Sequence, residues 1–129
     1  MKTLLLGDMS PTVLTDSLFA EGNVEALFSD TVSLFEGNDV NFVNLECALT
    51  ESTKSIEKFG PPLKACANVA KVLKEVGVNY CGLSNNHIFD FGIQGALDTM
   101  KALDEVGIAY TGFGENYEDS RKNYVVEKD

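Results

Sequence analysis

Short apolar or alternating runs are separated by helical patterns along most of the 129-residue chain. Each run has the length and apolar content of a strand that packs on a core. The runs cover residues 3–6, 40–45, 78–83 and 108–111. Between them, apolar residues recur every three or four positions, as they do on the core-facing side of a helix. This alternation predicts an α/β fold, in which a parallel β-sheet with buried strands carries flanking helices.

Three helices are predicted from their capping residues and from the glycines that end them. They extend from Asn23 to Gly37, from residue 66 to Gly77, and from a cap at Asp90 to Gly107. The last two belong to a local repeat, because residues 71–82 and residues 101–112 share the pattern of a helix, a glycine and a strand. Two such units favour a parallel sheet rather than a solenoid.

Two stretches interrupt this pattern. Residues 9–22 have no clear period, and residues 47–62 form a long polar loop that contains Gly60-Pro61-Pro62. A loop of this length within a domain often carries function, although it can also hold a ragged hairpin. A further apolar run begins at Tyr124. We expect residues 1–129 to form one domain.

Polar side chains follow each predicted strand at its carboxyl end. In an open parallel sheet, ligands bind at this edge. The side chains found there are Asp8, Asn44, Glu46, Asn85, Asn86, His87 and Thr111. His87 is the only histidine in the chain. Because these residues converge on one edge, the sequence predicts that they form a common site.

The polar set suits a hard divalent cation. Asp8 and Glu46 offer anionic oxygens, and the amide of Asn85 or Asn86 offers a neutral one. Oxygen-rich donors with one imidazole nearby favour Mg²⁺, Mn²⁺ or Fe²⁺ over zinc. The cation would polarise a phosphoryl or carbonyl oxygen. His87 would protonate a leaving group or stabilise charge on a phosphoryl oxygen.

Each of these residues also has a purely structural interpretation. Gly7-Asp8 can be a turn, and Asn85 and Asn86 can be present because asparagine tolerates positive φ. Asp90 is expected to cap the helix that follows it rather than to bind a ligand. A lone histidine is often only a hydrogen-bonded structural residue. The functional interpretation therefore depends on these residues lying together.

Charge and composition limit the partners of the chain. It has 20 acidic and 10 basic residues and a formal net charge of -10, so nucleic acid and anionic membranes are expected to repel it. Such an acidic surface can bind cations or can simply keep the protein soluble. The three cysteines, Cys47, Cys66 and Cys81, do not have the spacing of a disulfide framework, and Cys81 is predicted to lie in the core.

The ends of the chain suggest a location. The N-terminal apolar run is too short for a signal peptide, and no stretch is long enough to span a membrane. As written, the sequence predicts a cytoplasmic protein from a reducing compartment. A chain trimmed of its leader would look the same, so an extracellular or membrane-associated protein stays open.

Several motifs occur in an order and spacing that resemble a known family. They are Gly7-Asp8, Asn44-Leu45-Glu46, Ser84-Asn85-Asn86-His87-Ile88-Phe89-Asp90-Phe91-Gly92, Gly107-Ile108 and Gly112-Phe113-Gly114. Over nearly the whole chain they resemble the bacterial capsule-synthesis proteins (poly-γ-glutamate biosynthesis, CapA/PgsA-like), which are similar to the calcineurin-like metallophosphatases. By this resemblance, the metal ligands are Asp8, Glu46 and Asn86. The resemblance also implies that His87 is catalytic and that Asn44 and Asn85 support the ligands.

The chain departs from the family pattern in two places. Met9-Ser10-Pro11 follows Gly-Asp, where family members usually have an apolar stretch and a basic residue. The family domain is also longer, and its second half is expected to bring histidines that complete the metal site. The resemblance therefore implies the N-terminal half of a metallophosphatase-like α/β/β/α sandwich, with one sheet face unpacked. A missing C-terminal half or a second copy of the chain in a homodimer would cover that face.

Three functions follow from these observations. The first is a metal-dependent phosphoesterase-like site in a capsule or poly-γ-glutamate biosynthesis protein, acting on a phosphoester or a polyglutamate-related substrate and weak or inactive in the isolated chain. The second is a non-enzymatic subunit of a capsule or polyglutamate assembly complex. The third is a flavodoxin-like or receiver-like module, which predicts an acidic cluster where only Asp8 is found.

Overall fold

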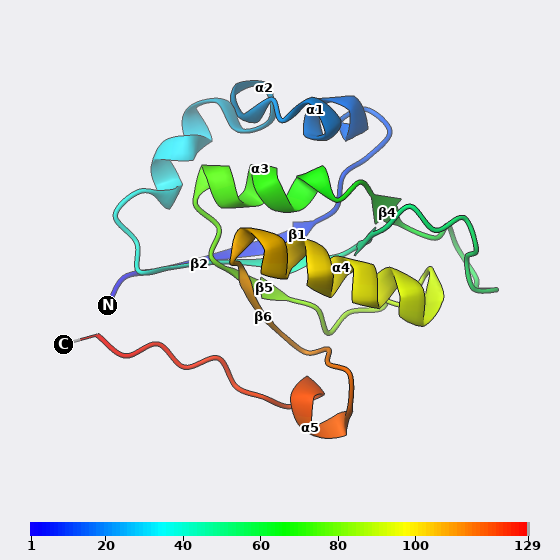
Figure 1. Ribbon diagram of the computed structural model, residues 1–129. Helices are drawn as coiled ribbons and strands as arrows, with labels where there is room; N and C mark the ends of the chain where they lie inside the picture. The colour runs from blue at the N-terminus through cyan, green and yellow to red at the C-terminus, as the bar shows by residue number, and fades with distance from the viewer. Residues whose placement is uncertain (129) are drawn as a thin grey trace.

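A four-stranded parallel β-sheet forms the centre of the computed structural model, which describes residues 1–128 (Figure 1). Its strands are β1 (Thr3–Met9), β2 (Val40–Leu45), β5 (Tyr80–Gly82) and β6 (Ala109–Thr111). They lie in the order β1-β2-β5-β6, and every neighbouring pair is parallel. The predicted α/β fold with a parallel sheet is confirmed.

Helices cover one face of this sheet, as Figure 1 shows. They are α1 (Asp16–Glu21), α2 (Val24–Phe28), the 3-10 helix η1 (Ser29–Phe35), α3 (Asn68–Val76) and α4 (Gly92–Val106). The short helix α5 (Tyr117–Ser120) lies on the other side of the sheet, together with the C-terminal segment. Within residues 1–128, no helix has the length and apolar character that crossing a membrane requires.

The core lies between the sheet and the helices. The helix α3 buries an apolar stripe there, and α4 adds a second stripe that includes Ala96 and Leu103. Both helices end at a glycine with positive φ, Gly77 at 106° and Gly107 at 66°, and lead into β5 and β6. Glycine adopts this conformation without steric cost because it has no Cβ. The repeated unit of helix, glycine and strand is therefore confirmed.

The three cysteines are free, as their spacing predicted. Cys47 and Cys81 are buried in the core, and burial raises the pKa of each thiol to about 12. A thiol that stays protonated is a weak nucleophile and a poor metal ligand. These two cysteines therefore serve as packing residues, and the prediction for Cys81 is confirmed.

The helix predicted to begin at Asn23 is broken in the structure. Asn23 does cap α2, since its side-chain oxygen accepts a 3.0 Å hydrogen bond from the Ala26 N–H. Ser29 then adopts a φ of 48°, and the chain continues as the 3-10 helix η1. Serine, aspartate, threonine and valine follow Phe28, and all are weak helix formers. The Thr31 hydroxyl also donates to the Phe28 carbonyl, which competes with helical hydrogen bonding.

Residues 3–6 form a parallel strand as predicted, but β1 lies at the edge of the sheet, and the prediction that this strand is buried is wrong. Leu4 and Leu6 pack against the core and are half-buried. The Leu5 side chain points to the opposite face and is 73% exposed. An edge strand with only one covered face buries alternate residues, whereas burial of the whole run would need helices on both faces.

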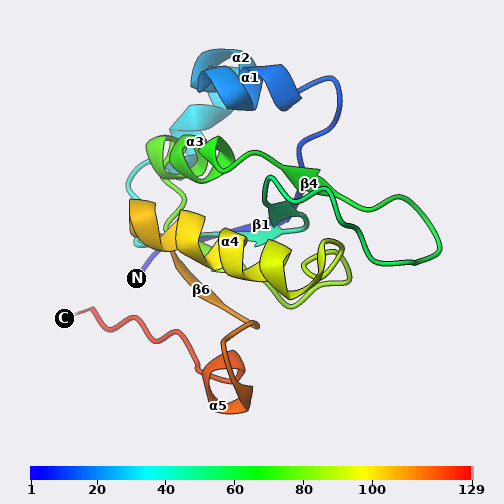
Figure 2. The same cartoon turned by 45° about the vertical axis from the view of Figure 1, so that its right-hand side comes forward.

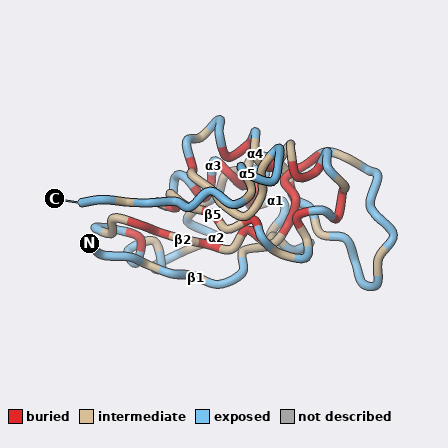
Figure 3. The backbone as a smooth tube through the Cα atoms, turned by 90° about the horizontal axis from the view of Figure 1, so that it is seen from below, coloured by how far each residue is buried: buried red, intermediate tan, exposed pale blue. Residues whose placement is uncertain are grey.

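The sheet face opposite the helices carries apolar side chains with little cover. Leu5, Phe42 and Tyr80 line a cavity of about 320 Å³ on this face. The C-terminal segment runs past it, and the Tyr124 ring stacks on Tyr80 with 4.5 Å between the centroids. Figure 3, seen from this side, shows the segment as largely exposed. The unpacked face implied by the family resemblance is therefore present, and residues 122–128 add no strand to it.

The long loop carries two short strands, β3 (Ala48–Leu49) and β4 (Lys64–Ala65). They pair in parallel, so the alternative of a ragged hairpin is wrong. Between them, residues 51–63 extend away from the sheet, as the green loop of Figure 2 shows. Hydrogen bonds from Ile56, Lys58 and Leu63 then attach this segment to the loop that contains His87.

Candidate functional site

The ends of β1 and β2 bring Asp8 beside Asn44. The two residues are partners in the sheet register, and the Asn44 amide donates a 2.8 Å hydrogen bond to the Asp8 carboxylate. The register shifts between Leu5 and Asp8, and such a bulge re-aims the side chains that follow it. The structure therefore brings these two predicted residues together at the carboxyl edge of the sheet.

Asn85 ties the loop after β5 to the same edge. Its side-chain NH₂ donates to the Asn44 side-chain oxygen at 3.2 Å and to the Leu45 carbonyl at 2.9 Å. Its oxygen accepts hydrogen bonds from the backbone N–H groups of His87 and Ile88, both at 3.0 Å. This is an Asx-type turn, which holds the loop in one shape. Asn85 thereby fixes the backbone of His87 relative to β2.

Gly112, just after β6, lets the same loop approach closely. Its φ is 92°, and a Cβ built there would lie 2.6 Å from the Ser84 Cβ. A side chain at this position would therefore displace the start of the Asn85 loop. Thr111 does not join the site, because its hydroxyl pairs with the Tyr80 hydroxyl at 2.6 Å on the open face.

Glu46 follows β2 and lies next to Asp8. Its backbone N–H donates to the Met9 carbonyl at 2.9 Å, which anchors it to the end of β1. Burial raises the pKa of the Glu46 carboxyl, and the hydrogen bond and negative charge of Asp8 raise it further, while His87 acts in the opposite direction. A proton or a cation stabilises two carboxyl groups that face each other in this way. Asp8, Glu46 and His87 are therefore within electrostatic reach of one another.

His87 forms a cluster of charged and hydrogen-bonded groups with Asp90 and Lys58. Its Nδ1 lies 2.7 Å from Asp90 Oδ2, and Lys58 Nζ lies 2.5 Å from Asp90 Oδ1. Asp90 is fully buried and also accepts a 2.6 Å hydrogen bond from the Leu63 N–H. Burial is the largest influence and opposes ionisation of Asp90, but these hydrogen bonds together outweigh it and lower the pKa of the carboxyl.

The prediction that Asp90 caps the following helix is wrong. The helix α4 begins at Gly92 with Phe91 at its N-cap, and no side chain caps it. The Asp90 carboxylate pairs instead with Lys58 and His87. The Lys58 ammonium carries a full positive charge, which a helical N–H does not, and a fully buried carboxylate needs such a partner to remain ionised.

Asn86 is exposed beside this cluster, and its backbone carbonyl accepts a 3.3 Å hydrogen bond from Lys58. Among residues 1–128, no group of three or more His, Cys, Asp or Glu side chains is arranged to hold a metal ion. The chain offers the Asp8 and Glu46 carboxylates together with an amide oxygen, and this donor chemistry fits a hard cation. The assignment of Asn86 as a ligand stays a prediction.

Lys58 is the residue of this cluster that the sequence did not reveal. It comes from the loop between β3 and β4 and lies 29 residues before His87 in the chain. The length of the polar loop was its only indication. Nothing in the local sequence distinguishes Lys58 from Lys54, which is exposed on the same loop, because only the folded contacts select one of them.

The model of the bacterial capsule synthesis protein family PGA_cap matches residues 2–129 of the chain. The chain belongs to this family. No curated protein matches it. The match confirms the resemblance inferred from Asp8, Glu46 and the His87 loop, and it extends over the Lys58 loop as well.

Two pockets flank the His87 loop of this capsule synthesis family member. Asn85 and Asn86 line one of about 350 Å³, together with Phe89. Phe89 and Phe113 line an adjoining pocket of about 490 Å³, and their rings meet edge to face with 5.3 Å between centroids. The polar loop and an apolar surface therefore lie side by side at this edge of the sheet.

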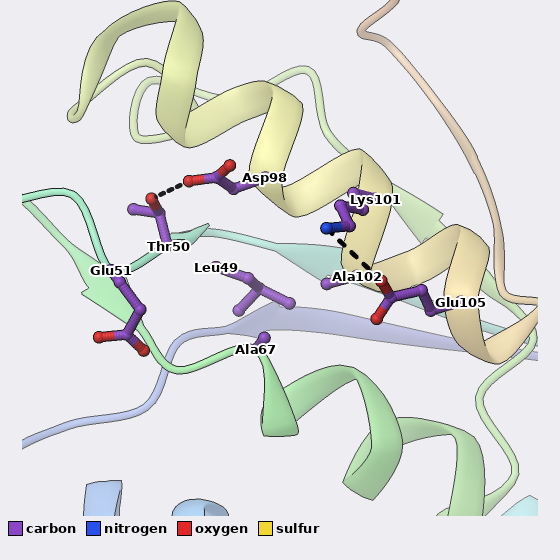
Figure 4. A pocket seen from close by; sticks show the side chains of 8 residues that line it. All are labelled: Leu49, Thr50, Glu51, Ala67, Asp98, Lys101, Ala102 and Glu105. Carbon is purple, nitrogen blue, oxygen red and sulfur yellow. Dashed lines mark hydrogen bonds and ion pairs between the residues drawn. The ribbon is translucent and has the colours of Figure 1, made fainter.

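A separate pocket of about 290 Å³ lies beside α4, and Figure 4 shows the residues that line it. Thr50 hydrogen-bonds to Asp98 there, and Lys101 lies 3.9 Å from Glu105. The acidic groups of Asp98 and Glu105 thus have partners on the pocket wall. The residues at the strand ends, rather than those of this pocket, form the candidate site.

Proposed function

We propose that the carboxyl edge of the sheet is a metal-dependent phosphoesterase-like site of a capsule or poly-γ-glutamate biosynthesis protein. The observation that supports this proposal is the pairing of the Asp8 and Glu46 carboxyls, in which burial and then the neighbouring Asp8 raise the pKa of Glu46. A divalent cation between two carboxylates removes their repulsion. Mn²⁺, Mg²⁺ and Fe²⁺ all accept oxygen donors of this kind.

In this proposal, Asp8, Glu46 and Asn86 hold the cation. Asn44 holds the Asp8 carboxylate through its 2.8 Å hydrogen bond, and Asn85 holds both Asn44 and the loop that carries Asn86. Ligands that are fixed by such hydrogen bonds bind a cation in one orientation. When bound, the cation supplies Lewis acidity that polarises a phosphoryl oxygen and favours attack by water.

His87 transfers a proton or stabilises charge at the phosphoryl group in this proposal. Asp90 and Lys58 occupy its Nδ1 side, so the other ring nitrogen is the one available to a substrate. The substrate class is a phosphoester or a polyglutamate-related compound. A C-terminal half or a second copy of the chain, packed on the open sheet face, would supply further ligands.

Hydrolysis of a chromogenic phosphoester in the presence of Mn²⁺ tests this proposal. We expect slow, metal-dependent turnover that Asp8→Asn and His87→Ala reduce at least about tenfold. Asp30→Asn changes an exposed carboxylate on η1 and serves as the matched control, with unchanged turnover expected. Turnover that is insensitive to Asp8→Asn and His87→Ala would contradict the proposal.

A second candidate is a non-enzymatic subunit of a capsule or polyglutamate assembly complex. The exposed apolar face around Leu5, Phe42 and Tyr80 favours it, since such a face is suited to packing against another protein surface. In this case the site would bind a ligand without turnover. Phosphoester hydrolysis that needs metal and is lost in His87→Ala would exclude this candidate.

A further inference from the structure

Two groups compete for one nitrogen of His87. Asp90 Oδ2 lies 2.7 Å from His87 Nδ1, and Lys58 Nζ lies 3.3 Å from the same atom. A lysine ammonium can only donate a hydrogen bond, and an ionised carboxylate can only accept one. The ring nitrogen can therefore satisfy one of these neighbours but not both.

The geometry decides between them. If His87 Nδ1 accepted from Lys58, its lone pair would face the Asp90 oxygen at 2.7 Å, and two acceptors at this distance repel each other. If Nδ1 carries the proton, it donates to Asp90, and Lys58 still donates to Asp90 Oδ1 at 2.5 Å and to the Asn86 carbonyl at 3.3 Å. In the second arrangement both Asp90 oxygens accept hydrogen bonds, and Lys58 keeps two acceptors of its own.

Residues 56–63 hold Asp90 in the orientation that this arrangement needs. The Ile56 N–H donates to the Asp90 carbonyl at 2.8 Å, and the Leu63 N–H donates to Asp90 Oδ2 at 2.6 Å. Lys58 binds the other carboxylate oxygen. The loop that the fold extends beyond the sheet thus returns to fix the carboxylate from both sides, and it leaves Oδ2 directed at His87.

We propose that Asp90 and Lys58 are positioning residues for His87. Asp90 keeps the proton of the neutral imidazole on Nδ1, and Lys58 keeps the Asp90 carboxylate in place. The free Nε2 lone pair is then the part of the ring that meets a substrate or a cation. The effect of this arrangement on turnover rests on the proposed function. The position of the proton on Nδ1 does not.

Nitrogen-15 NMR of the imidazole tests the proposal directly, because His87 is the only histidine in the chain. We expect long-range ¹H–¹⁵N spectra of the full chain, recorded where the ring is neutral, to show the Nδ1–H tautomer. In Asp90→Asn, Lys58 becomes the neighbour able to donate to Nδ1, so the Nε2–H tautomer should appear. A wild-type spectrum of the Nε2–H tautomer would overturn the proposal, even if Asp90→Asn failed to fold.

Variants of Lys58 test whether this residue keeps the Asp90 carboxylate in place. In Lys58→Met, we expect the His87 resonances to broaden and the amides of residues 56–63 to exchange faster with solvent, and Lys58→Arg should restore both. Lys54→Met is the matched control, since Lys54 is exposed on the same loop. Unchanged His87 resonances and amide exchange in Lys58→Met would overturn the role of Lys58.

An activity measurement separates this proposal from the proposed function. If the site turns over a phosphoester, Lys58→Met should lower kcat about tenfold and leave KM nearly unchanged, as for other residues that orient a functional side chain. If no variant shows turnover, the proposed function fails, while the tautomer of His87 still decides the positioning proposal. A higher KM with an unchanged kcat in Lys58→Met would contradict the positioning role.

Discussion

The side-chain amide of Asn44 donates a 2.8 Å hydrogen bond to the carboxylate of Asp8, and this bond joins the ends of two neighbouring strands. It orients the carboxylate that we assign to a cation. We expect Asn44→Ala to reduce the free energy of unfolding by about 1 kcal/mol and to weaken Mn²⁺ binding. Denaturant unfolding and calorimetric titration measure the two effects, and Asn123→Ala, at an exposed position, is the control.

The stability of the fold is expected to depend on pH through Glu46. Its pKa in the folded chain is raised above the ordinary value of 4.5, first by burial and then by Asp8, so its ionisation opposes folding. The stability that the protonated Glu46 carboxyl contributes is present below pH 4.5 and is lost as the pH rises through the folded-state pKa. Without metal, Glu46→Gln should therefore be more stable than the wild type at neutral pH and equal to it in acid. A variant that is less stable than the wild type at neutral pH would contradict the paired carboxyls.

Asp90 is expected to change the stability with pH in the opposite direction. Its pKa is lowered below the ordinary value of 3.8, because its hydrogen bonds outweigh the effect of burial. Its contribution to stability is therefore present above pH 3.8 and is lost as the pH falls through the lower folded-state pKa. Asp90→Asn should be less stable than the wild type at neutral pH and should lose less stability in acid. Equal acid sensitivity of the two proteins would show that Asp90 is not held as an ion.

Lys58 is expected to stabilise the fold through the same cluster. Its removal in Lys58→Met leaves a fully buried carboxylate without its ammonium partner, which should cost about 2 kcal/mol of unfolding free energy. Urea unfolding at neutral pH measures this loss. The exposed Lys54 on the same loop is the control, because Lys54→Met should change stability by less than about 0.5 kcal/mol.

Gly112 is expected to tolerate no side chain. Gly112→Ala combines a φ of 92° with a Cβ only 2.6 Å from that of Ser84, so we expect a loss of about 2 kcal/mol and displacement of the Asn85 loop. Gly7→Ala is the control, since a Cβ at Gly7 would meet no atom within 4 Å. Thermal unfolding of the two variants measures the difference. Equal stability of both would contradict the close approach of β6 to the loop.

The sequence allowed much of the fold to be predicted, because the decisive features are local. A glycine at the end of a helix and an apolar run after it are enough to predict the units that end at Gly77 and Gly107. The break at Ser29 was harder to see, since the apolar period continues through it. The exposure of Leu5 also depends on which strand lies at the sheet edge, and no local pattern encodes that position.

The candidate site was predictable only where its residues stand at strand ends. Asp8, Asn44 and Asn85 came together because parallel strands share one carboxyl edge. The partners of Asp90 could not be foreseen, because Lys58 reaches it from a loop whose path is fixed by tertiary contacts. For the same reason, a helix cap was the natural but wrong expectation for Asp90.

The central claim is that Asp8 and Glu46 bind a divalent cation at this edge. Isothermal titration of the chain with Mn²⁺ tests it most directly, with Asp8→Asn, Glu46→Gln and the control Asp30→Asn measured alongside. We predict saturable binding with one ion per chain, lost in the first two variants and unchanged in the control. The absence of binding by the wild type, or binding that survives in both Asp8→Asn and Glu46→Gln, would contradict the claim.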